Sequence, residues 1–225
     1  MEENRIAVVA ELLRDSLAEL LIPVVKLTIP LAGSSFALGL VLALALALVR
    51  LRRTPVLSQL AGFFIWFVRG TPMLVQLFII FFGLPAVGLT VDPIPSAVMV
   101  FTANVGAYAS EILRGAISAV PSGQWSAGRS LGLTEWAVLR LVVLPQAFRT
   151  AFPALVNTLL GLIKDTSLAS AVTVVEMFMA AQLAAARTFE PFWLYMEAAA
   201  IYLLISTAVA AAGAAMERRL TIPAR

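Results

Sequence analysis

The sequence contains neither cysteine nor histidine in its 225 residues. Without cysteine the chain forms no disulfide and no thiolate metal site, and without histidine it lacks the commonest metal ligand and neutral-pH general base. Charged residues are also scarce, at 13% of the chain, whereas 61% of the residues are hydrophobic. Soluble domains are usually about 45–50% apolar, so we expect lipid to surround much of the molecule, and we expect no metal site.

Motifs for nucleotide binding and catalysis are missing as well. The sequence has no Gly-x-x-x-x-Gly-Lys-Ser/Thr loop and therefore offers no P-loop cradle for nucleotide phosphates. It has no histidine-containing triad and no aspartate pair with catalytic spacing inside an apolar segment. The first residues are acidic and provide no basic region before an apolar run, which argues against a cleaved signal peptide. We expect no catalytic residue and no cofactor on this chain, which disfavours a membrane enzyme.

Five segments are long and apolar enough to cross a membrane, which takes roughly 20 predominantly apolar residues. The sequence therefore predicts an all-α, polytopic membrane helical bundle with five transmembrane helices. Pro145 and Pro153 flank the expected start of the fourth helix, and Arg69 lies near the centre of the second. The five segments run from about Thr28 to Val49, Ser58 to Phe82, Ile94 to Leu113, Pro153 to Val175 and Trp193 to Met216.

Lysine and arginine are distributed unevenly between the two sides of these segments. Cytoplasmic loops carry the excess of basic residues, so the side with ten of them is predicted to be cytoplasmic and the side with four to be external. With an odd number of spans, the N-terminus lies outside and the C-terminus inside. The ten are Arg50, Arg52, Arg53, Arg114, Arg129, Arg140, Arg149, Arg218, Arg219 and Arg225, and the four are Arg5, Arg14, Lys26 and Arg187.

The segment from Arg5 to Leu21 has the pattern of an amphipathic helix, with apolar residues at three- and four-residue steps and charges on the other face. It is too charged to span, and we expect it to lie on the outer membrane surface. The predicted division is an external amphipathic segment at 1–27, a transmembrane domain at 28–216 that includes a loop at 120–145, and a cytoplasmic tail at 217–225.

The loop at 120–145 predicts two short cytoplasmic helices joined by a turn. Ser122 is a suitable N-cap for the first helix, which covers Gln124 to Leu131. Gly132 suits a left-handed C-terminal cap, with Leu133 supplying the apolar contact that accompanies such caps. Thr134 is then placed to cap a second helix that starts at the next residue.

Composition alone leaves two interpretations of this loop open. A cytoplasmic helix that presents Trp125, Leu131 and Leu133 beside Arg129 favours docking of a partner protein. Equally, the loop could pack against the cytoplasmic ends of its own spans.

The loop resembles the cytoplasmic signature of ABC importer permeases: Glu-Ala-Ala, three residues, Gly, nine residues, Ile, one residue, Leu-Pro. Gly132 and Leu144-Pro145 match at the expected spacing, and Val142 stands at the isoleucine. Serine replaces the glutamate of the triplet and glycine replaces its second alanine, which leaves the helix–turn–helix pattern intact. In the family this loop is the coupling helix that sits in a groove of the ATPase subunit. The implied coupling residues are Ser126, Ala127, Gly128, Arg129, Leu131, Gly132 and Leu133.

Four further segments are similar, in order, to motifs of the polar amino-acid subfamily: Arg69–Phe78, Ala107–Gly115, Leu144–Ala147 and Lys164–Leu168. The resemblance implies a type I ABC importer-like permease subunit in the bacterial cytoplasmic membrane that translocates polar or charged amino acids. It also implies an ATP-binding ABC subunit that carries ATP and Mg, a second permease subunit (identical or different) and a periplasmic or extracellular amino-acid-binding protein. Membrane lipid surrounds such a subunit, and no nucleic acid is involved.

Polar residues inside the predicted spans have two interpretations, because a charge there costs at least ~2.5–3.5 kcal/mol and normally faces protein or water. In a substrate pathway, Arg69 or Lys164 would bind the carboxylate of an amino acid, and Asp165 or Glu111 its ammonium group. Alternatively, these charges neutralise one another or fix the subunit interface, and Glu111 pairs with Arg114. The candidate pathway residues are Arg69, Gln76, Asn104, Tyr108, Glu111, Asn157, Lys164 and Asp165.

An ion-coupled secondary amino-acid transporter is the alternative function, and the intramembrane Asp165 keeps it open. Five spans provide no pair of inverted repeats within the chain, which counts against the usual architecture of such transporters.

Overall fold

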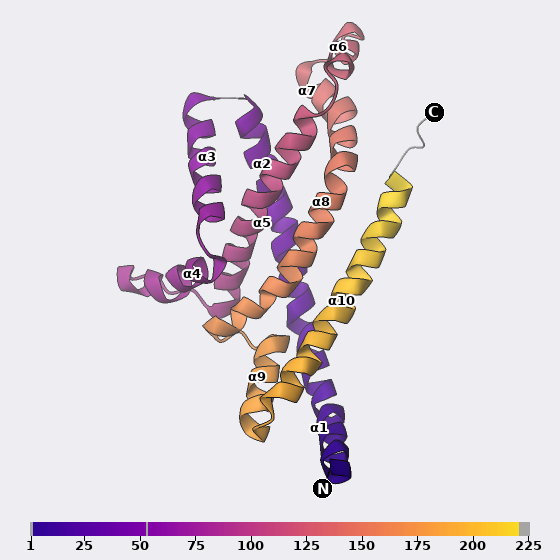
Figure 1. Cartoon of the computed structure of the whole chain (residues 1–225). Helices are drawn as coiled ribbons and strands as arrows, with labels where there is room; N and C mark the ends of the chain where they lie inside the picture. The colour runs from indigo at the N-terminus through magenta and orange to yellow at the C-terminus, as the bar shows by residue number, and fades with distance from the viewer. Residues whose placement is uncertain (1, 53, 221–225) are drawn as a thin grey trace. The chain divides into compact units, whose positions relative to one another are not determined.

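The chain is helical throughout the part that the computed structural model describes, residues 2–52 and 54–220, where no β-strand occurs (Figure 1). The α-helices are α1 (Glu2–Pro23), α2 (Ile29–Arg52), α3 (Pro55–Gly70), α4 (Met73–Phe78), α5 (Pro93–Ser118), α6 (Ser122–Ser130), α7 (Glu135–Val138), α8 (Leu144–Asp165), α9 (Met177–Thr188) and α10 (Pro191–Leu220). Wider π-helical turns are η1 (Val24–Thr28), η2 (Ile79–Gly83) and η4 (Leu139–Val143), and tighter 3₁₀ turns are η3 (Leu84–Val87) and η5 (Thr166–Val172).

The helices form two compact units, and several helices run from one unit into the other. The first unit contains Met1–Phe36, Pro72–Phe101 and Leu160–Val209. The second unit contains Ala37–Thr71, Thr102–Leu159 and Ala210–Arg225.

Four helical segments are long and apolar enough to cross a membrane, and a fifth span results if α3 and the segment from α4 to η3 cross together as one broken span. A re-entrant loop is the other geometry open to that broken pair. The all-α polytopic bundle predicted from the sequence is thus confirmed, with four or five spans. The four segments are Ala7–Arg52, Pro93–Ser118, Glu135–Val172 and Pro191–Leu220.

The first helix is continuous, which contradicts the separate surface helix and first span expected on either side of residue 27. Pro23 keeps helical dihedral angles, with φ −61° and ψ −31°, and the π-helical turn η1 follows it directly. The ring and the missing N–H of a proline disturb the turn that precedes it, so the wider turn η1 accommodates Pro30, the second residue of α2, without ending the helix. The predicted boundary at residue 27 therefore falls inside one helix.

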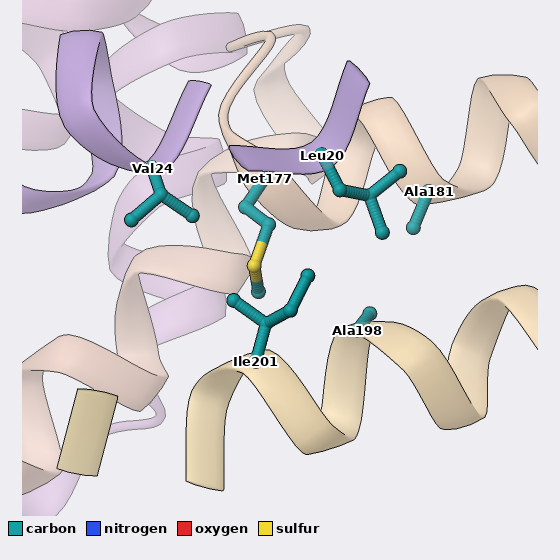
Figure 2. Packing of buried hydrophobic residues seen from close by; sticks show 6 residues of the cluster. All are labelled: Leu20, Val24, Met177, Ala181, Ala198 and Ile201. Atoms are coloured by element: carbon teal, nitrogen blue, oxygen red, sulfur yellow. The ribbon is translucent and has the colours of Figure 1, made fainter. Parts of the chain in front are cut away.

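Part of the apolar face of α1 packs against neighbouring helices. Leu20 and Val24 are buried together with side chains of α9 and α10 in one cluster (Figure 2). Figure 2 shows the two α1–η1 side chains pointing towards Met177 and Ile201. The amphipathic pattern was correctly located, but its partner is a neighbouring helix because α9, which the sequence did not predict, supplies an apolar surface.

The second predicted span is broken where a continuous helix was expected. Thr71 is extended, with φ −120° and ψ 147°, and Pro72 follows with ψ 133°. A proline disfavours helical dihedrals at the residue before it. The hydroxyl of Thr71 donates to the carbonyl of Phe67 at 2.9 Å and so satisfies one acceptor that the break exposes. Arg69 consequently lies in the last turn of α3, next to the break.

The fourth predicted span starts earlier than expected. Its helical segment runs from Glu135 to Val172 and contains both Pro145 and Pro153, which were expected to mark its start. The π-helical turn η4 immediately precedes Leu144 and accommodates Pro145 as η1 does Pro30. Lys164 and Asp165 end α8, ahead of the tighter turn η5, and do not lie in the middle of a regular helix.

Glycines bring α2 and α5 into close contact within the second unit. A methyl group built on Gly39 would lie 2.5 Å from Cβ of Val105. A methyl group built on Gly106 would lie 2.5 Å from Cδ2 of Leu42. Small residues at such contacts let helix backbones approach, which is how helices associate in lipid without a hydrophobic driving force between them.

We expect Gly39→Ala to lower the stability of the protein by about 1–3 kcal/mol, because the new methyl group overlaps Val105. Gly33→Ala is the matched control: it lies on the same helix, its new methyl group would have no atom within 4 Å, and it gains the same helix propensity. Thermal unfolding of the two purified variants in one detergent measures the difference. Equal melting temperatures would contradict the close approach of α2 and α5.

Candidate functional site

A left-handed glycine closes α6, as the sequence predicts. Gly132 has φ +79°, which glycine adopts without steric cost. The N–H of Gly132 donates to the carbonyl of Arg129 at 2.9 Å, and the N–H of Leu133 donates to the carbonyl of Gly128 at 3.2 Å. These two bonds form a complete Schellman motif, so the direction in which the chain leaves α6 is fixed by backbone hydrogen bonds.

The two helix starts in this region differ in how well the sequence predicted them. Thr134 caps α7, since its Oγ1 accepts the N–H of Ala137 at 3.3 Å. Ser122, predicted as the N-cap of α6, is instead its first helical residue, and Pro121 occupies the cap position without a side-chain hydrogen bond. The prediction for Ser122 is wrong because Pro121 itself takes the non-helical conformation (ψ 138°) that precedes a helix.

Gly128 explains one departure from the family signature. It is buried, and a methyl group there would lie 2.8 Å from Cγ2 of Val138 in α7. The second alanine of the family triplet would therefore collide with a β-branched side chain whose χ1 is restricted. Gly128 lets α6 and α7 pack closely, because it lies buried on the side of α6 that faces α7.

The remaining predicted coupling residues face outwards. Arg129 forms an ion pair with Glu135 at 3.1 Å and donates a hydrogen bond to Oγ of Ser126 at 3.3 Å. Both charged side chains are about half exposed or more, so this pair contributes little to stability. Leu131 is 81% exposed. Ser126, Ala127, Arg129, Leu131 and Gly132 are exposed, and Leu133 is half-buried.

Within the second unit, one face of this loop packs against the chain's own helices, as the second interpretation expects. Trp125 and Trp136 line a cavity of about 360 Å³ together with Leu48, Leu51 and Ile117 at the ends of α2 and α5. The tryptophan face thus packs towards the chain's own helices. The opposite face, with the exposed Leu131 at its tip, is left open by the described part of the chain.

Polar residues of the second unit largely satisfy one another. The Arg69 guanidinium lies 5.1 Å from the ring centroid of Tyr108, within the range of a cation–π contact. Arg114 and Glu111 form an ion pair at 2.7 Å, which confirms the predicted pairing. The two asparagines proposed for the pathway differ in exposure, since Asn104 is half-buried and Asn157 is exposed.

Within the first unit, Lys164 lines a cavity of about 530 Å³ with Ser167 and residues of α9 and α10. Asp165 is half-buried and does not line this cavity. Lys164 is exposed, and among the described residues no carboxylate lies within salt-bridge distance of it, but its charge interacts with that of Asp165 at longer range. Gln76, the third pathway candidate in this unit, is buried.

Glu176 is a buried polar centre that no motif or periodicity in the sequence marks. Its side chain is 0% exposed, and it caps α9 by accepting the N–H of Met179 at 3.0 Å. Tyr202 donates its hydroxyl to the carboxylate at 3.0 Å and Thr28 donates at 3.4 Å. Glutamate is not among the preferred N-cap residues, and its partners are distant in sequence, so only the fold reveals the cluster.

Comparison with known proteins identifies the family of the chain. The family model of binding-protein-dependent transport system inner membrane components matches residues 35–222. The chain belongs to this family. Such a component is a transport subunit and not an enzyme, and ATP hydrolysis takes place on a separate partner.

Two characterised relatives cover most of the chain. The L-cystine transport system permease protein TcyB of Bacillus subtilis (strain 168) is 49% identical over 194 residues, which is 86% of this chain and 83% of that protein. The nopaline transport system permease protein NocM of Agrobacterium fabrum (strain C58 / ATCC 33970) is 37% identical over 199 residues, covering 84% of this chain and 83% of that protein.

Solved structures agree with this assignment. The crystal structure of an amino acid ABC transporter with histidines superimposes with a TM-score of 0.80 at 31% identity, covering 85% of this chain and 90% of that one. An inward-facing MetNI methionine ABC transporter has a TM-score of 0.70 at 19% identity, covers 94% of this chain and 97% of that one, and supports the type I importer fold. The chain is a permease subunit of the amino-acid ABC importer kind, and none of these four proteins favours the ion-coupled alternative.

Glu176→Gln tests the buried cluster through its pH dependence. Burial raises the pKa of Glu176 above its ordinary value, against the opposing effect of its hydrogen bonds. A carboxyl whose pKa is raised by folding contributes stability that is fully present below its unfolded pKa and is lost as the pH rises through the folded value. Glutamine keeps the shape and cannot ionise, so the variant loses this dependence.

We therefore expect the melting temperature of Glu176→Gln to fall less than that of the wild type from about pH 5 to about pH 8. Thermal unfolding of the purified permease across this range is the measurement. Glu11→Gln, at an exposed position of α1, is the control and should follow the wild type. Parallel curves for wild type and Glu176→Gln would show that the Glu176 carboxyl does not titrate differently on folding.

Proposed function

We propose that this permease lines the path of an amino acid through the bacterial inner membrane and receives the ATP-driven signal through α6 and the turn at Gly132. One observation carries the proposal: the Schellman motif holds an 81% exposed leucine, Leu131, at the tip of a helical pair outside the candidate spans. An exposed apolar side chain on a fixed backbone favours a protein partner. The predicted contact residues Ser126, Ala127 and Arg129 lie on the same exposed helix.

The proposed assembly contains two permease subunits, an ATP-binding subunit that carries ATP and Mg, and an external amino-acid-binding protein. The family to which the chain belongs is defined by dependence on a binding protein, which supports the external partner. The absence of a P-loop in the sequence requires that nucleotide be bound elsewhere.

L-cystine is the first substrate to test, because the relative that is 49% identical is named for it. Other relatives are named for nopaline and glutamine, so the family accommodates different amino acids. Within the first unit, Lys164 is the polar group proposed for the path.

Gly132→Val tests the coupling role of the turn. A β-branched residue strongly resists the left-handed conformation, which costs roughly 1–2 kcal/mol even for ordinary residues. We expect normal membrane insertion and loss of substrate-stimulated ATP hydrolysis in the reconstituted complex, measured with and without loaded binding protein. Gly132→Asn is the control, because asparagine tolerates this conformation, and it should retain most of the stimulation. Unchanged stimulation in Gly132→Val would exclude this turn as the coupling element.

The proposed orientation places the N-terminus outside and the C-terminus in the cytoplasm. The native chain has no cysteine, so single cysteines report their side without background. We expect Ser130→Cys in α6 to be labelled by a membrane-impermeant maleimide only from the cytoplasmic side, and Val87→Cys in η3 only from outside. Labelling of both from one side would show that α5, which lies between them, does not cross the membrane, and the reverse pattern would contradict the proposed orientation.

A further inference from the structure

A cavity of about 360 Å³ lies where the candidate spans α2 and α5 end and the α6–α7 pair begins. This volume is within the range of about 300–1,000 Å³ that is usual for small-molecule sites. Arg52, the last residue of α2, and Ser118, the last residue of α5, both line the cavity. The described residues of its wall all belong to the second unit. Since spans end where hydrocarbon gives way to headgroups, we place the cavity at the membrane–water interface.

The wall changes from apolar to polar along the direction of the two spans. Leu48, Leu51 and Ile117 line the cavity from positions inside α2 and α5. Arg52 and Ser118 line it from the ends of the same helices. This order matches an amphiphile whose polar head lies at the helix ends and whose apolar part lies alongside the spans.

Two tryptophans of the helical pair, Trp125 and Trp136, complete the polar end of the wall. Tryptophan is enriched at membrane–water interfaces because its ring is apolar and its N–H group is polar. The two rings therefore agree with an interfacial position of this cavity.

The polar groups of the wall are mainly hydrogen-bond donors. A guanidinium and an indole N–H can donate but cannot accept. The side chains of Arg52, Trp125 and Trp136 make no hydrogen bond or ion pair with any described residue. Glu135 is the one carboxylate among the described residues of the wall, and Arg129 already binds it at 3.1 Å. The wall thus offers donors and an unpaired positive charge, which complement a phosphate diester.

From this composition we infer that the cavity binds the headgroup of an anionic phospholipid. The phosphate lies at Arg52, with Ser118 and the indole N–H groups as further donors, and the acyl chains continue along Leu48 and Ile117 into the bilayer. Basic pockets between helices on the cytoplasmic side are typical sites for anionic headgroups, and the proposed orientation places the cavity on that side.

A lipid fits this wall better than a soluble anion does. A free phosphate would leave the leucines and the isoleucine of the wall uncovered, whereas acyl chains cover them and gain the free energy of apolar contact. The cavity lies on the tryptophan face of the helical pair. A lipid there leaves Leu131, on the opposite face, open to a protein partner.

Quenching of tryptophan fluorescence by brominated lipids tests this inference on the full-length permease in nanodiscs. The chain has four tryptophans, so Trp66→Phe with Trp193→Phe leaves Trp125 and Trp136 as reporters. The probes are phosphatidylglycerol and phosphatidylcholine with brominated acyl chains, each diluted into unbrominated phosphatidylcholine. We expect phosphatidylglycerol to reach half-maximal quenching at a roughly fivefold lower mole fraction, the preference that one arginine near an anionic lipid provides.

Arg52→Gln in this background should make the two mole fractions equal. Arg140→Gln is the matched control, because Arg140 is an exposed arginine of η4 that does not line the cavity, and it should keep the preference. Native mass spectrometry with all four tryptophans in place is the second measurement. The wild type should retain phosphatidylglycerol, and Arg52→Gln should lose it.

Three results would overturn the inference. They are equal mole fractions for the two lipids when Arg52 is present, an equal loss of preference in Arg140→Gln and Arg52→Gln, and release of phosphatidylglycerol by millimolar inorganic phosphate, which would assign the cavity to a soluble anion. These results measure lipid binding and not transport, so the proposed function would stand. Conversely, an importer that takes up no amino acid in proteoliposomes would leave the lipid site intact.

Discussion

The structure depends on one constraint: in lipid, every backbone N–H and carbonyl group must find a partner within the protein. Prolines inside apolar segments therefore do not end helices where a wider turn precedes them, as before Pro30 and before Pro145. Where the helix does break, at Thr71 and Pro72, the threonine hydroxyl donates a hydrogen bond to a carbonyl of the preceding turn. The long continuous helices and the broken pair both follow from this requirement.

The sequence predicts a structural feature correctly where the residues that determine that feature are neighbours in the chain. The apolar segments, the left-handed Gly132 and the cap at Thr134 depend on adjacent residues, and the structure contains all of them. The helix α9 was not predicted because its 12 residues are too few to span a membrane and carry a weak periodic signal. Glu176 and the burial of α1 depend on contacts across more than a hundred residues, which no local pattern contains.

The family signature has a physical explanation at the glycines of α6. Gly132 directs the chain out of α6. Gly128 has no side chain, so Val138 of α7 can lie directly against α6 at this position. Serine stands at position 126 where the family signature has glutamate. This replacement leaves the helical pair intact, because backbone hydrogen bonds and packing hold the pair and that side chain does not. What the signature preserves in this chain is a rigid angle between two helices, with exposed residues attached to it.

Satisfaction of polar groups separates structural residues from those available to a substrate. Glu111 is paired with Arg114, and Arg69 rests on the ring of Tyr108, so their interactions are already made within the second unit. Lys164, by contrast, is exposed and has no carboxylate within salt-bridge distance among the described residues, although its charge interacts with that of Asp165. Charges inside a membrane protein are retained where they pair with one another or serve function. By this criterion the paired Glu111 and Arg114 serve the structure, whereas Lys164 is bound less closely by the rest of the protein.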